Sequence, residues 1–298
     1  MKVIVTGSNG QLGIELCKKG RKRGLDVAAL DLPEFDITDA KAVDDAVSSD
    51  SHVLAVINAA AYTAVDKAES EPDLAFLVNQ KGPANLAKSC NKKGIPLIHV
   101  STDYVFDGSK KDPYVETDPV SPAGVYGKSK TAGEGDVRRF LKEHIILRTA
   151  WLCSEHGSNF VKTMIRLGQE RDEIGVVADQ YGCPTFACDL AEAILGIVVK
   201  SEENNDIPWG TYHYCGKGVT TWYGFAKTTL DMARSYTALK VQRITPLSTE
   251  EYPTPAKRPA NSAMDCSLIE ENFNISPRRW QDGLRHLVKR LFVYSADE

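Results

Sequence analysis

Tyr126 and Lys130 are the residues whose types and spacing best suit acid–base chemistry in this chain. They lie four residues apart in a stretch with helical character, so both side chains share one face of a helix. A phenol has a pKa near 10, and a neighbouring ammonium group stabilises the phenolate and lowers that pKa. We therefore expect Tyr126 to donate a proton to a carbonyl oxygen while a hydride reaches the carbonyl carbon.

Polar residues before this pair distinguish it from two other pairs with the same spacing. The other pairs are Tyr223 with Lys227 and Tyr236 with Lys240. Only the first pair follows a strand end that reads Ser101-Thr102-Asp103. The hydroxyl of Thr102 could hydrogen-bond the same carbonyl oxygen and stabilise its developing charge, with Asp103 beside it. We interpret the other two pairs as surface or packing residues.

A glycine-rich turn near the N-terminus predicts a dinucleotide site. The run Gly7-Ser8-Asn9-Gly10-Gln11-Leu12-Gly13 follows a short apolar run and precedes a helical stretch. Gly7 permits a tight turn, Gly10 lets the backbone approach a pyrophosphate, and Gly13 lets the helix pack closely on the sheet. The helix N-terminus offers free N–H groups to the phosphates. We expect NADH or NADPH here, with Lys130 also holding the nicotinamide ribose.

Carboxylates after the second apolar run bear on the choice of cofactor. Asp31 lies 18 residues after Gly13, where a carboxylate can accept a hydrogen bond from a ribose 2′-hydroxyl. This favours NADH over NADPH, since no arginine directly follows it to hold a 2′-phosphate. Asp36 and Ile37 could flank the adenine, although Asp36 could instead hold a turn. The small residues Asn58-Ala59-Ala60-Ala61 would let a flat ligand pass over the end of the third strand.

These residues require a scaffold that brings the ends of several strands together. Apolar runs typical of buried strands occur at 2–6, 25–30, 53–57, 95–100 and 145–147, and helical stretches at 11–23, 38–47, 73–93 and 122–143. The alternation predicts parallel pairing. Right-handed crossovers then give a doubly wound α/β sheet of the Rossmann type. We expect Thr38 to be the N-cap of the second helix.

The less regular second half predicts a smaller α/β substrate domain. Helical stretches lie at 159–171, 189–200, 222–235 and 280–293, strands at 174–178, 212–215 and 241–245, and loops at 201–206 and 252–259. We place the dinucleotide-binding domain at 1–150 and the substrate domain at 151–298. The division need not be contiguous, because the helix at 187–200 could return to the first domain.

The composition excludes several classes of protein. The 298 residues are 42% hydrophobic and 26% charged with a net charge of −4, which excludes a disordered chain. No run approaches the ~20 apolar residues of a membrane span, and a pI near 5.9 disfavours nucleic-acid binding.

The seven cysteines are an odd number without a Cys-x-x-Cys pair, which indicates reduced thiols. Residues 1–7 lead directly into a strand rather than a secretory signal, so we expect a cytoplasmic protein.

Motifs along nearly the whole chain resemble the dTDP-4-dehydrorhamnose reductase family of the extended short-chain dehydrogenase/reductase superfamily. Besides the glycine turn and the Tyr126–Lys130 pair, the matching stretches are 58–69, 101–106, 148–151, 159–164, 179–185 and 258–262. The resemblance implies reduction of the 4-keto group of dTDP-4-dehydro-β-L-rhamnose to dTDP-L-rhamnose, with hydride from NADPH or NADH. Related dehydratases carry Thr-Asp-Glu, whose acidic pair drives water elimination. Here Tyr104 takes the third position, which favours simple reduction.

The resemblance also implies roles for individual residues. The implied catalytic residues are Tyr126, Lys130, Thr102 and Asp103, and the implied cofactor contacts are Gly10, Gln11, Leu12, Asp31, Asp36, Ile37, Ala61, Tyr62 and Thr63. Thr102 and Asp103 would also contact the sugar. Trp151 would line the substrate pocket, with a core aromatic as its alternative role. The stretch 179–185 and Arg258 would shape the sugar-nucleotide site, because an arginine can bind a pyrophosphate in a bidentate way.

Two other functions fit the same residues. The β subunit of methionine adenosyltransferase resembles this family and acts as a regulatory binding protein. It carries an extension before its glycine turn, whereas this chain begins at the strand, which favours the enzyme. A sugar-nucleotide 4-epimerase would use the same tyrosine and lysine and would retain its NAD.

The expected partners are a dTDP-sugar substrate and a second copy of the chain, with neither nucleic acid nor membrane. Some family members are dimers bridged by magnesium through glutamates, one of them early in the first helix. Glu15 could match that glutamate. No further ligands can be placed from the sequence, so we assign no metal-binding residues, and magnesium stays open as an additional cofactor.

Overall fold

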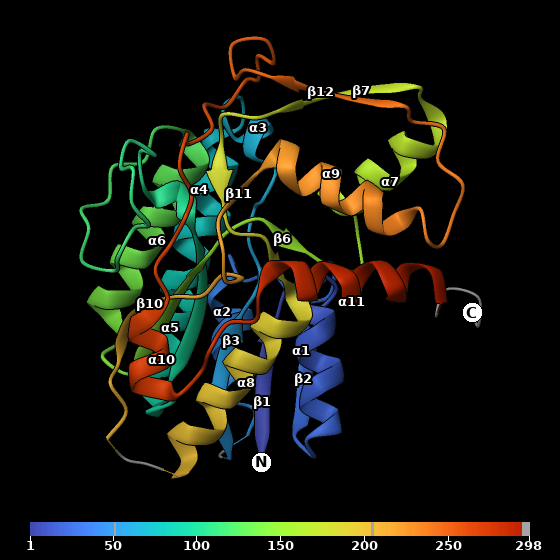
Figure 1. The fold of residues 1–298 in the computed structure, drawn as a ribbon. Helices are drawn as coiled ribbons and strands as arrows, with labels where there is room; N and C mark the ends of the chain where they lie inside the picture. Colours follow the sequence, from blue (N-terminus) through green and yellow to red (C-terminus); the bar gives the residue numbers. More distant parts are fainter. Residues whose placement is uncertain (51, 204–205, 294–298) are drawn as a thin grey trace.

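The computed structural model describes residues 1–50, 52–203 and 206–293, and its centre is a six-stranded parallel sheet (Figure 1). The strand order is β10-β5-β4-β3-β1-β2, and neighbouring strands all pair in parallel. The strands are β1 (Lys2–Thr6), β2 (Asp26–Leu30), β3 (Val53–Asn58), β4 (Leu97–Thr102), β5 (His144–Thr149) and β10 (Gly210–His213). The predicted doubly wound sheet is confirmed. The strand order reverses between β1 and β3, and sheets of this kind bind ligands at such a reversal.

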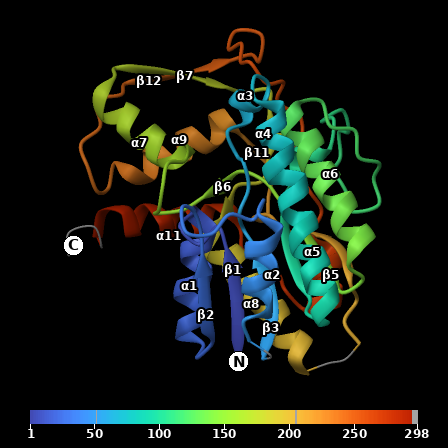
Figure 2. The ribbon, with the colours of Figure 1, turned by 180° about the vertical axis from the view of Figure 1, so that it is seen from behind.

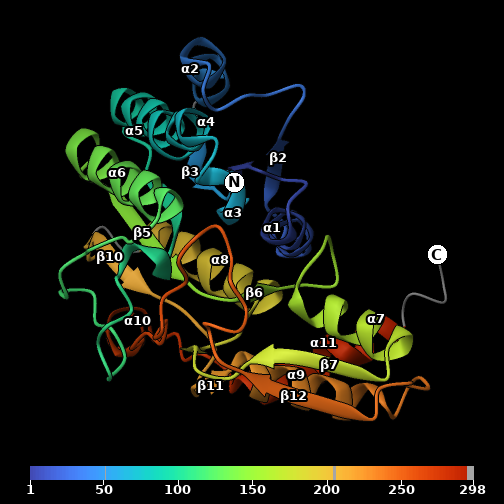
Figure 3. The same ribbon diagram turned by 90° about the horizontal axis from the view of Figure 1, so that it is seen from above.

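Helices cover both faces of this sheet, as the row of helices on each side in Figures 2 and 3 shows. One face carries α1 (Gln11–Lys22), α8 (Ala187–Glu203) and α10 (Ser267–Phe273), and the other carries α2 (Ala40–Ser48), α5 (Gly82–Lys93) and α6 (Val125–Phe140). Successive strand residues alternate between the two cores, with Val3 and Val5 in the first and Ile4 in the second. Burial on both faces explains the continuous apolar runs in the sequence.

The start of α2 differs from the prediction that Thr38 is its N-cap. The N-cap is Asp39, whose carboxylate accepts hydrogen bonds from the amides of Lys41 at 2.8 Å and Ala42 at 3.1 Å. The amide of Thr38 instead donates to Asp36 at 2.8 Å. Both candidates are good capping residues, so the sequence alone could not separate two neighbours.

Several element boundaries differ from the predictions. The predicted helix at 73–93 is α4 (Pro72–Phe76), a π-helix (Leu77–Lys81) and α5, in one continuous run. The predicted loop at 201–206 is wrong for residues 201–203, because α8 continues to Glu203, and residues 204 and 205 lie outside the described part of the chain. Four short strands and two short α-helices were not predicted: β6 (Leu152–Cys153), β8 (Tyr181–Gly182), β9 (Thr185–Phe186), β11 (Thr220–Thr221), α3 (Val65–Ala68) and α10.

The second half contributes to the central sheet and also builds a separate layer. β10 pairs with β5, and α8 packs in the same core as α1. The separate layer contains α7 (Phe160–Glu170), α9 (Trp222–Ala233), α11 (Trp280–Val293) and the parallel strands β7 (Glu173–Val177) and β12 (Arg243–Leu247). The division near residue 150 remains a prediction. Among the described residues, no helix has the length and apolar character to cross a bilayer.

Candidate active site

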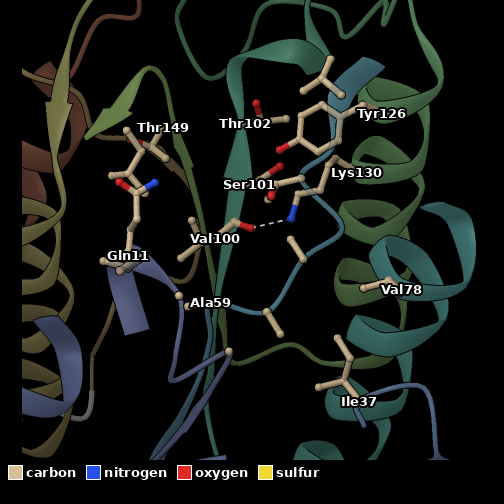
Figure 4. A pocket seen from close by; sticks show the side chains of 18 of the residues that line it. Gln11, Ile37, Ala59, Val78, Val100, Ser101, Thr102, Tyr126, Lys130 and Thr149 are labelled. Atoms are coloured by element: carbon tan, nitrogen blue, oxygen red, sulfur yellow. Dashed lines mark hydrogen bonds between the residues drawn. The ribbon is translucent and has the colours of Figure 1, made fainter. Parts of the chain in front are cut away.

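A cavity of about 690 Å³ lies at the carboxyl ends of the central strands. It is lined by most of the predicted site residues: Gly7, Gly10, Gln11, Leu12, Asp31, Asp36, Ile37, Ala61, Thr63, Thr102, Asp103, Tyr126, Lys130 and Trp151. Figure 4 shows Tyr126 and Lys130 projecting from α6 beside the end of β4, with Gln11 and Thr149 on the facing side. Gly13, Tyr62 and Arg258 were also predicted, but they are not among the lining residues.

The glycine turn leaves room for backbone contacts that a side chain would block. Gly7 has a φ of +71°, and a Cβ there would lie 2.5 Å from the amide nitrogen of Ala60. A Cβ at Gly13 would lie 2.0 Å from the carbonyl oxygen of Gly7. Gly10, the N-cap of α1, supplies no capping side chain, so the first amides of the helix are left for an anion. This cradle fits the pyrophosphate of a dinucleotide.

Asp31 ties the glycine turn to the end of β2. Its carboxylate accepts hydrogen bonds from the amides of Asn9 at 2.7 Å and Leu32 at 2.8 Å, and it also lines the cavity. Asp36 lines the cavity too, while its bond to the Thr38 amide gives it the turn role that was its alternative. Among the described residues that line the cavity, Lys130 is the only lysine or arginine.

Lys130 is buried and its ammonium group is bound to the sheet. Its Nζ donates a hydrogen bond of 2.7 Å to the carbonyl oxygen of Val100, the contact dashed in Figure 4. Burial lowers the pKa of Lys130 to about 8, although the charge of Glu134 opposes this shift. Lys130 is therefore held next to β4 by this hydrogen bond.

The pKa of Tyr126 moves in the opposite direction to the one predicted. Burial raises it to about 12, the charge of Asp103 adds to this, and a hydrogen bond with Thr102 partly offsets it. The prediction that the pKa of Tyr126 is lowered is therefore wrong. Loss of hydration is the largest cause of the raised pKa, and the ammonium group of Lys130 donates its hydrogen bond to Val100 instead.

Thr102 and Asp103 form a short polar chain beside Tyr126. The hydroxyl of Thr102 donates to Asp103 Oδ1 at 2.9 Å and accepts the amide of Tyr104 at 3.3 Å. Burial raises the pKa of Asp103 to about 6, and hydrogen bonds with Ser262 and Thr102 oppose this shift. The structure thus brings together a phenol, a hydroxyl and a carboxyl group at the end of β4.

A buried ion pair supports α6 from behind. Glu134 accepts from Arg148 Nε at 2.9 Å and Nη2 at 2.7 Å, and from the partly exposed Arg138 at 2.8 Å. The guanidinium groups hold the pKa of Glu134 below its usual range although burial opposes this. This arrangement was not predicted, although Arg148 lies in one of the matching motifs.

Trp151 has both of the roles that the sequence left open. It lines the cavity, and its ring stacks on Trp222 with centroids 3.5 Å apart and an interplanar angle of 10°. Its φ of +50° is in the left-handed region. Gly182 lies against the same ring, since a Cβ there would be 2.4 Å from Trp151 Cε2. The 179–185 stretch therefore contacts the wall of the cavity.

Arg258 is held away from the cavity lining. Its guanidinium group binds both carboxylate oxygens of Asp66, with Nη1 and Nη2 distances of 2.8 and 2.7 Å. Tyr62 is likewise set back, and its amide donates to Asn79 at 2.8 Å. The position of each follows from contacts with distant segments, which local sequence does not indicate.

Sequence reasoning missed several residues that line the cavity: Leu32, Phe35, Leu77, Val78, Val100, Ser101, Tyr104, Thr149, Ala150, Leu152 and Ser158. A signal exists for Val100, Ser101 and Thr149, because they end strands that were predicted. Leu77 and Val78 lie in the π-helix, a feature often found at functional sites but without a sequence signal here.

Glu15 does not belong to a set of residues that fits magnesium. The described residues place its carboxylate near Glu155 and His156, with ligand atoms within 4.8 Å of one another. Magnesium prefers six oxygen ligands in near-ideal octahedral geometry. Here one donor is an imidazole, and Glu155 already forms ion pairs with Arg290 and Lys18. We derive no metal chemistry from this cluster.

Comparison with known proteins identifies close relatives over the whole length. Residues 1–293 match the family model described as the RmlD substrate binding domain. The dTDP-4-dehydrorhamnose reductase of Sinorhizobium fredii is 42% identical over 299 residues, covering 100% of both chains. The crystal structure of a dTDP-4-dehydrorhamnose reductase from Clostridium acetobutylicum superimposes with a TM-score of 0.91 at 40% identity, covering 98% of this chain and 99% of that one. One from Bacillus anthracis, in complex with NADP, has a TM-score of 0.89 at 39% identity and covers 96% and 98%.

Proposed function

The chain belongs to the dTDP-4-dehydrorhamnose reductase family, and on this basis we propose that it reduces the 4-keto group of dTDP-4-dehydro-β-L-rhamnose to give dTDP-L-rhamnose. The reaction adds a hydride to the carbonyl carbon and a proton to its oxygen. A bound nicotinamide cofactor supplies the hydride. The protein has to bind both molecules, orient the carbonyl group and deliver the proton.

Tyr126 is the proton donor in this proposal. A donor must be protonated at neutral pH, and a phenol whose pKa is raised to about 12 meets that requirement. As Tyr126 releases its proton to the substrate oxygen, the Thr102 hydroxyl can turn its single proton from Asp103 to the phenolate and stabilise it. Thr102 and Asp103 also contact the sugar, and Trp151 forms the wall against which the sugar ring packs.

The residues of the glycine turn hold the cofactor. The open amides of α1 bind the pyrophosphate, and Asp31 accepts a hydrogen bond from the adenosine ribose. We propose that NADH binds more tightly than NADPH, because a 2′-phosphate would meet the Asp31 carboxylate with no basic partner among the described lining residues. Lys130 orients the nicotinamide ribose, and Ile37, Ala61 and Thr63 line the adenosine part of the cavity.

Arg258 and the 179–185 stretch are proposed to shape the site for the nucleotide pyrophosphate. The protein is proposed to work in the cytoplasm, which agrees with seven free thiols, as in a reducing compartment. We also propose that the protein forms a homodimer and that its two domains divide at residue 150.

The placement of Tyr126 beside Thr102 at the end of β4 carries the mechanism. The test follows NADH or NADPH oxidation with the dTDP-keto-sugar, using Tyr126→Phe. We expect kcat to fall about 10²- to 10⁴-fold while the Kd for the cofactor stays within about twofold, since the phenyl ring is kept. Tyr223→Phe, from another pair with the same spacing, is the matched control.

Unchanged turnover in Tyr126→Phe would overturn the assignment of the acid. Protein that is inactive with every dTDP-keto-sugar, yet purifies with NAD at one equivalent, would favour the epimerase. A protein that has no turnover but binds the catalytic subunit of a methionine adenosyltransferase would favour the function of a regulatory subunit.

A further inference from the structure

The short helix α3 places two acidic side chains against two separate parts of the active site. Asp66 lies within the helix, and Glu69 is its C-cap residue. Asp66 binds Arg258 in the loop before α10, whereas Glu69 binds the first residue of α6. Neither acid lines the cavity, so neither can act on a ligand directly there.

Glu69 completes the N-terminus of the catalytic helix. Its Oε1 accepts a hydrogen bond of 2.8 Å from the amide of Val125, the residue before Tyr126. The N-cap of α6 is Gly124, which has no side chain to cap the first turn of the helix. A carboxylate at this position also interacts favourably with the helix dipole. The start of α6, and with it Tyr126, is therefore fixed by a side chain 56 positions earlier in the sequence.

Gly124 is the residue that makes this contact possible. A Cβ at position 124 would lie 2.7 Å from Glu69 Oε1. The backbone of Gly124 is extended, with a φ of −110°, so alanine would be tolerated there. Replacing the glycine would push away the flexible end of Glu69 rather than strain the backbone.

Asp66 holds the loop that carries Arg258. Besides the bidentate pair with the guanidinium group, its Oδ1 accepts the amide of Ala256 at 3.1 Å. Burial raises the pKa of Tyr104, and the charge of Arg258 opposes this shift. Tyr104 lines the cavity, and its ring meets that of Tyr126 edge-on with centroids 5.5 Å apart. Asp66 thus sets the position of the Arg258 guanidinium group, whose charge acts on a residue of the cavity lining.

We propose that Asp66 and Glu69 are positioning residues, with Glu69 acting through Tyr126 on turnover and Asp66 acting through Arg258 on binding of the sugar nucleotide. This inference rests on the proposed function, because it assigns the proton donor to α6 and a pyrophosphate contact to Arg258. It makes α3 the element that holds the two sides of the active site in register.

The first test breaks the contact of Glu69 from both sides. We expect Glu69→Ala and Gly124→Ala each to lower kcat about tenfold or more, because small displacements of a reacting group are costly. The KM for the sugar nucleotide and the Kd for NADH should stay within about twofold. Glu69→Gln should restore most of kcat, since its amide oxygen can still accept the Val125 amide. The double variant should be no slower than either single variant, because both remove one contact.

The second test uses Asp66→Ala in the same assay. We expect the KM for the sugar nucleotide to rise about tenfold with kcat within about twofold, the reverse of the Glu69 result. Asp73→Ala, at an exposed acid in the first turn of α4, is the matched control and should leave both constants unchanged.

The outcomes separate the inference from the proposed function. A wild-type protein without reductase activity would defeat the proposed function itself. With an active wild type, unchanged kcat in Glu69→Ala, or additive losses in the double variant, would overturn the role of Glu69. Unchanged or lower KM in Asp66→Ala would overturn the role of Asp66. If both variants showed the same fall in kcat and the same rise in KM, α3 would have a merely structural role. A lowered thermal unfolding temperature in both variants would then show that the fold itself is weakened.

Discussion

The carboxyl group of Asp103 is buried, so the folded protein is less stable when this group is ionised. Its pKa is about 6 in the folded chain, against about 3.9 in an unfolded one. The folded state therefore binds more protons between these values, so stability falls as pH rises from about 4 to about 6. Above that range the ionised group costs about 3 kcal/mol at most.

Asp103→Asn should therefore raise the thermal unfolding temperature near about pH 8, while activity falls. The gain should shrink as the pH is lowered toward about 5, because the wild-type carboxyl group then becomes neutral as well. Thermal unfolding at both pH values tests this, with Asp73→Asn as an exposed control. A variant less stable than the wild type at the higher pH would contradict the assignment.

The ammonium group of Lys130 predicts how activity ends at high pH. Burial lowers its pKa to about 8, so the charge is present below that pH and is lost above it. We expect kcat/KM for the sugar nucleotide to fall as pH rises past about 8. Lys130→Arg keeps its charge at all accessible pH values, so any activity it retains should persist to higher pH. A profile that falls at the same pH in both proteins would exclude Lys130 as the titrating group.

At the scale of elements, α6 depends on a buried charge pair for its place on the sheet. Glu134 and Arg148 are almost completely buried, whereas the side chain of Arg138 is 40% exposed. Glu134→Ala leaves the Arg148 guanidinium group buried without its partner, and we expect a loss of about 3–5 kcal/mol in the free energy of unfolding. Arg138→Ala should cost less than about 1 kcal/mol. Urea unfolding of both variants measures this difference, and equal losses would contradict it.

The strands and the glycine turn were predictable because their signals are local. A buried parallel strand is a continuous apolar run, and a dinucleotide turn needs glycines at fixed steps. The π-helix at Leu77–Lys81 has no such signal, since the helical pattern of 73–93 continues through it. The choice of Asp39 over Thr38 as N-cap was equally hidden, because both residue types can cap a helix.

At the scale of the whole molecule, contacts between distant segments decide what the sequence could not show. Arg258 is a good pyrophosphate ligand by residue type, yet its partner Asp66 lies 192 residues away. The same limit applies to Lys130, whose effect on Tyr126 was predicted from spacing alone. Its ammonium group binds the carbonyl oxygen of Val100, 30 residues away. Residue types were thus predictable, while the partner of each charge depended on the fold.

A cluster around Glu155 joins three parts of the chain, and its charges predict how the protein responds to divalent metal ions. Glu15 comes from α1, Glu155 and His156 follow β6, and Arg290 comes from α11. Arg290 and Lys18 already neutralise Glu155, so a divalent cation would have to displace a guanidinium group.

We therefore expect the unfolding temperature, kcat and oligomeric state to be the same after EDTA treatment and in added magnesium. Glu155→Ala should lower the unfolding temperature, since it leaves Arg290 without this carboxylate partner, and magnesium should not restore it. Calorimetry and size-exclusion chromatography test both statements. A rise in unfolding temperature on adding magnesium to the wild type, lost in Glu15→Gln, would show that the cluster binds the ion after all.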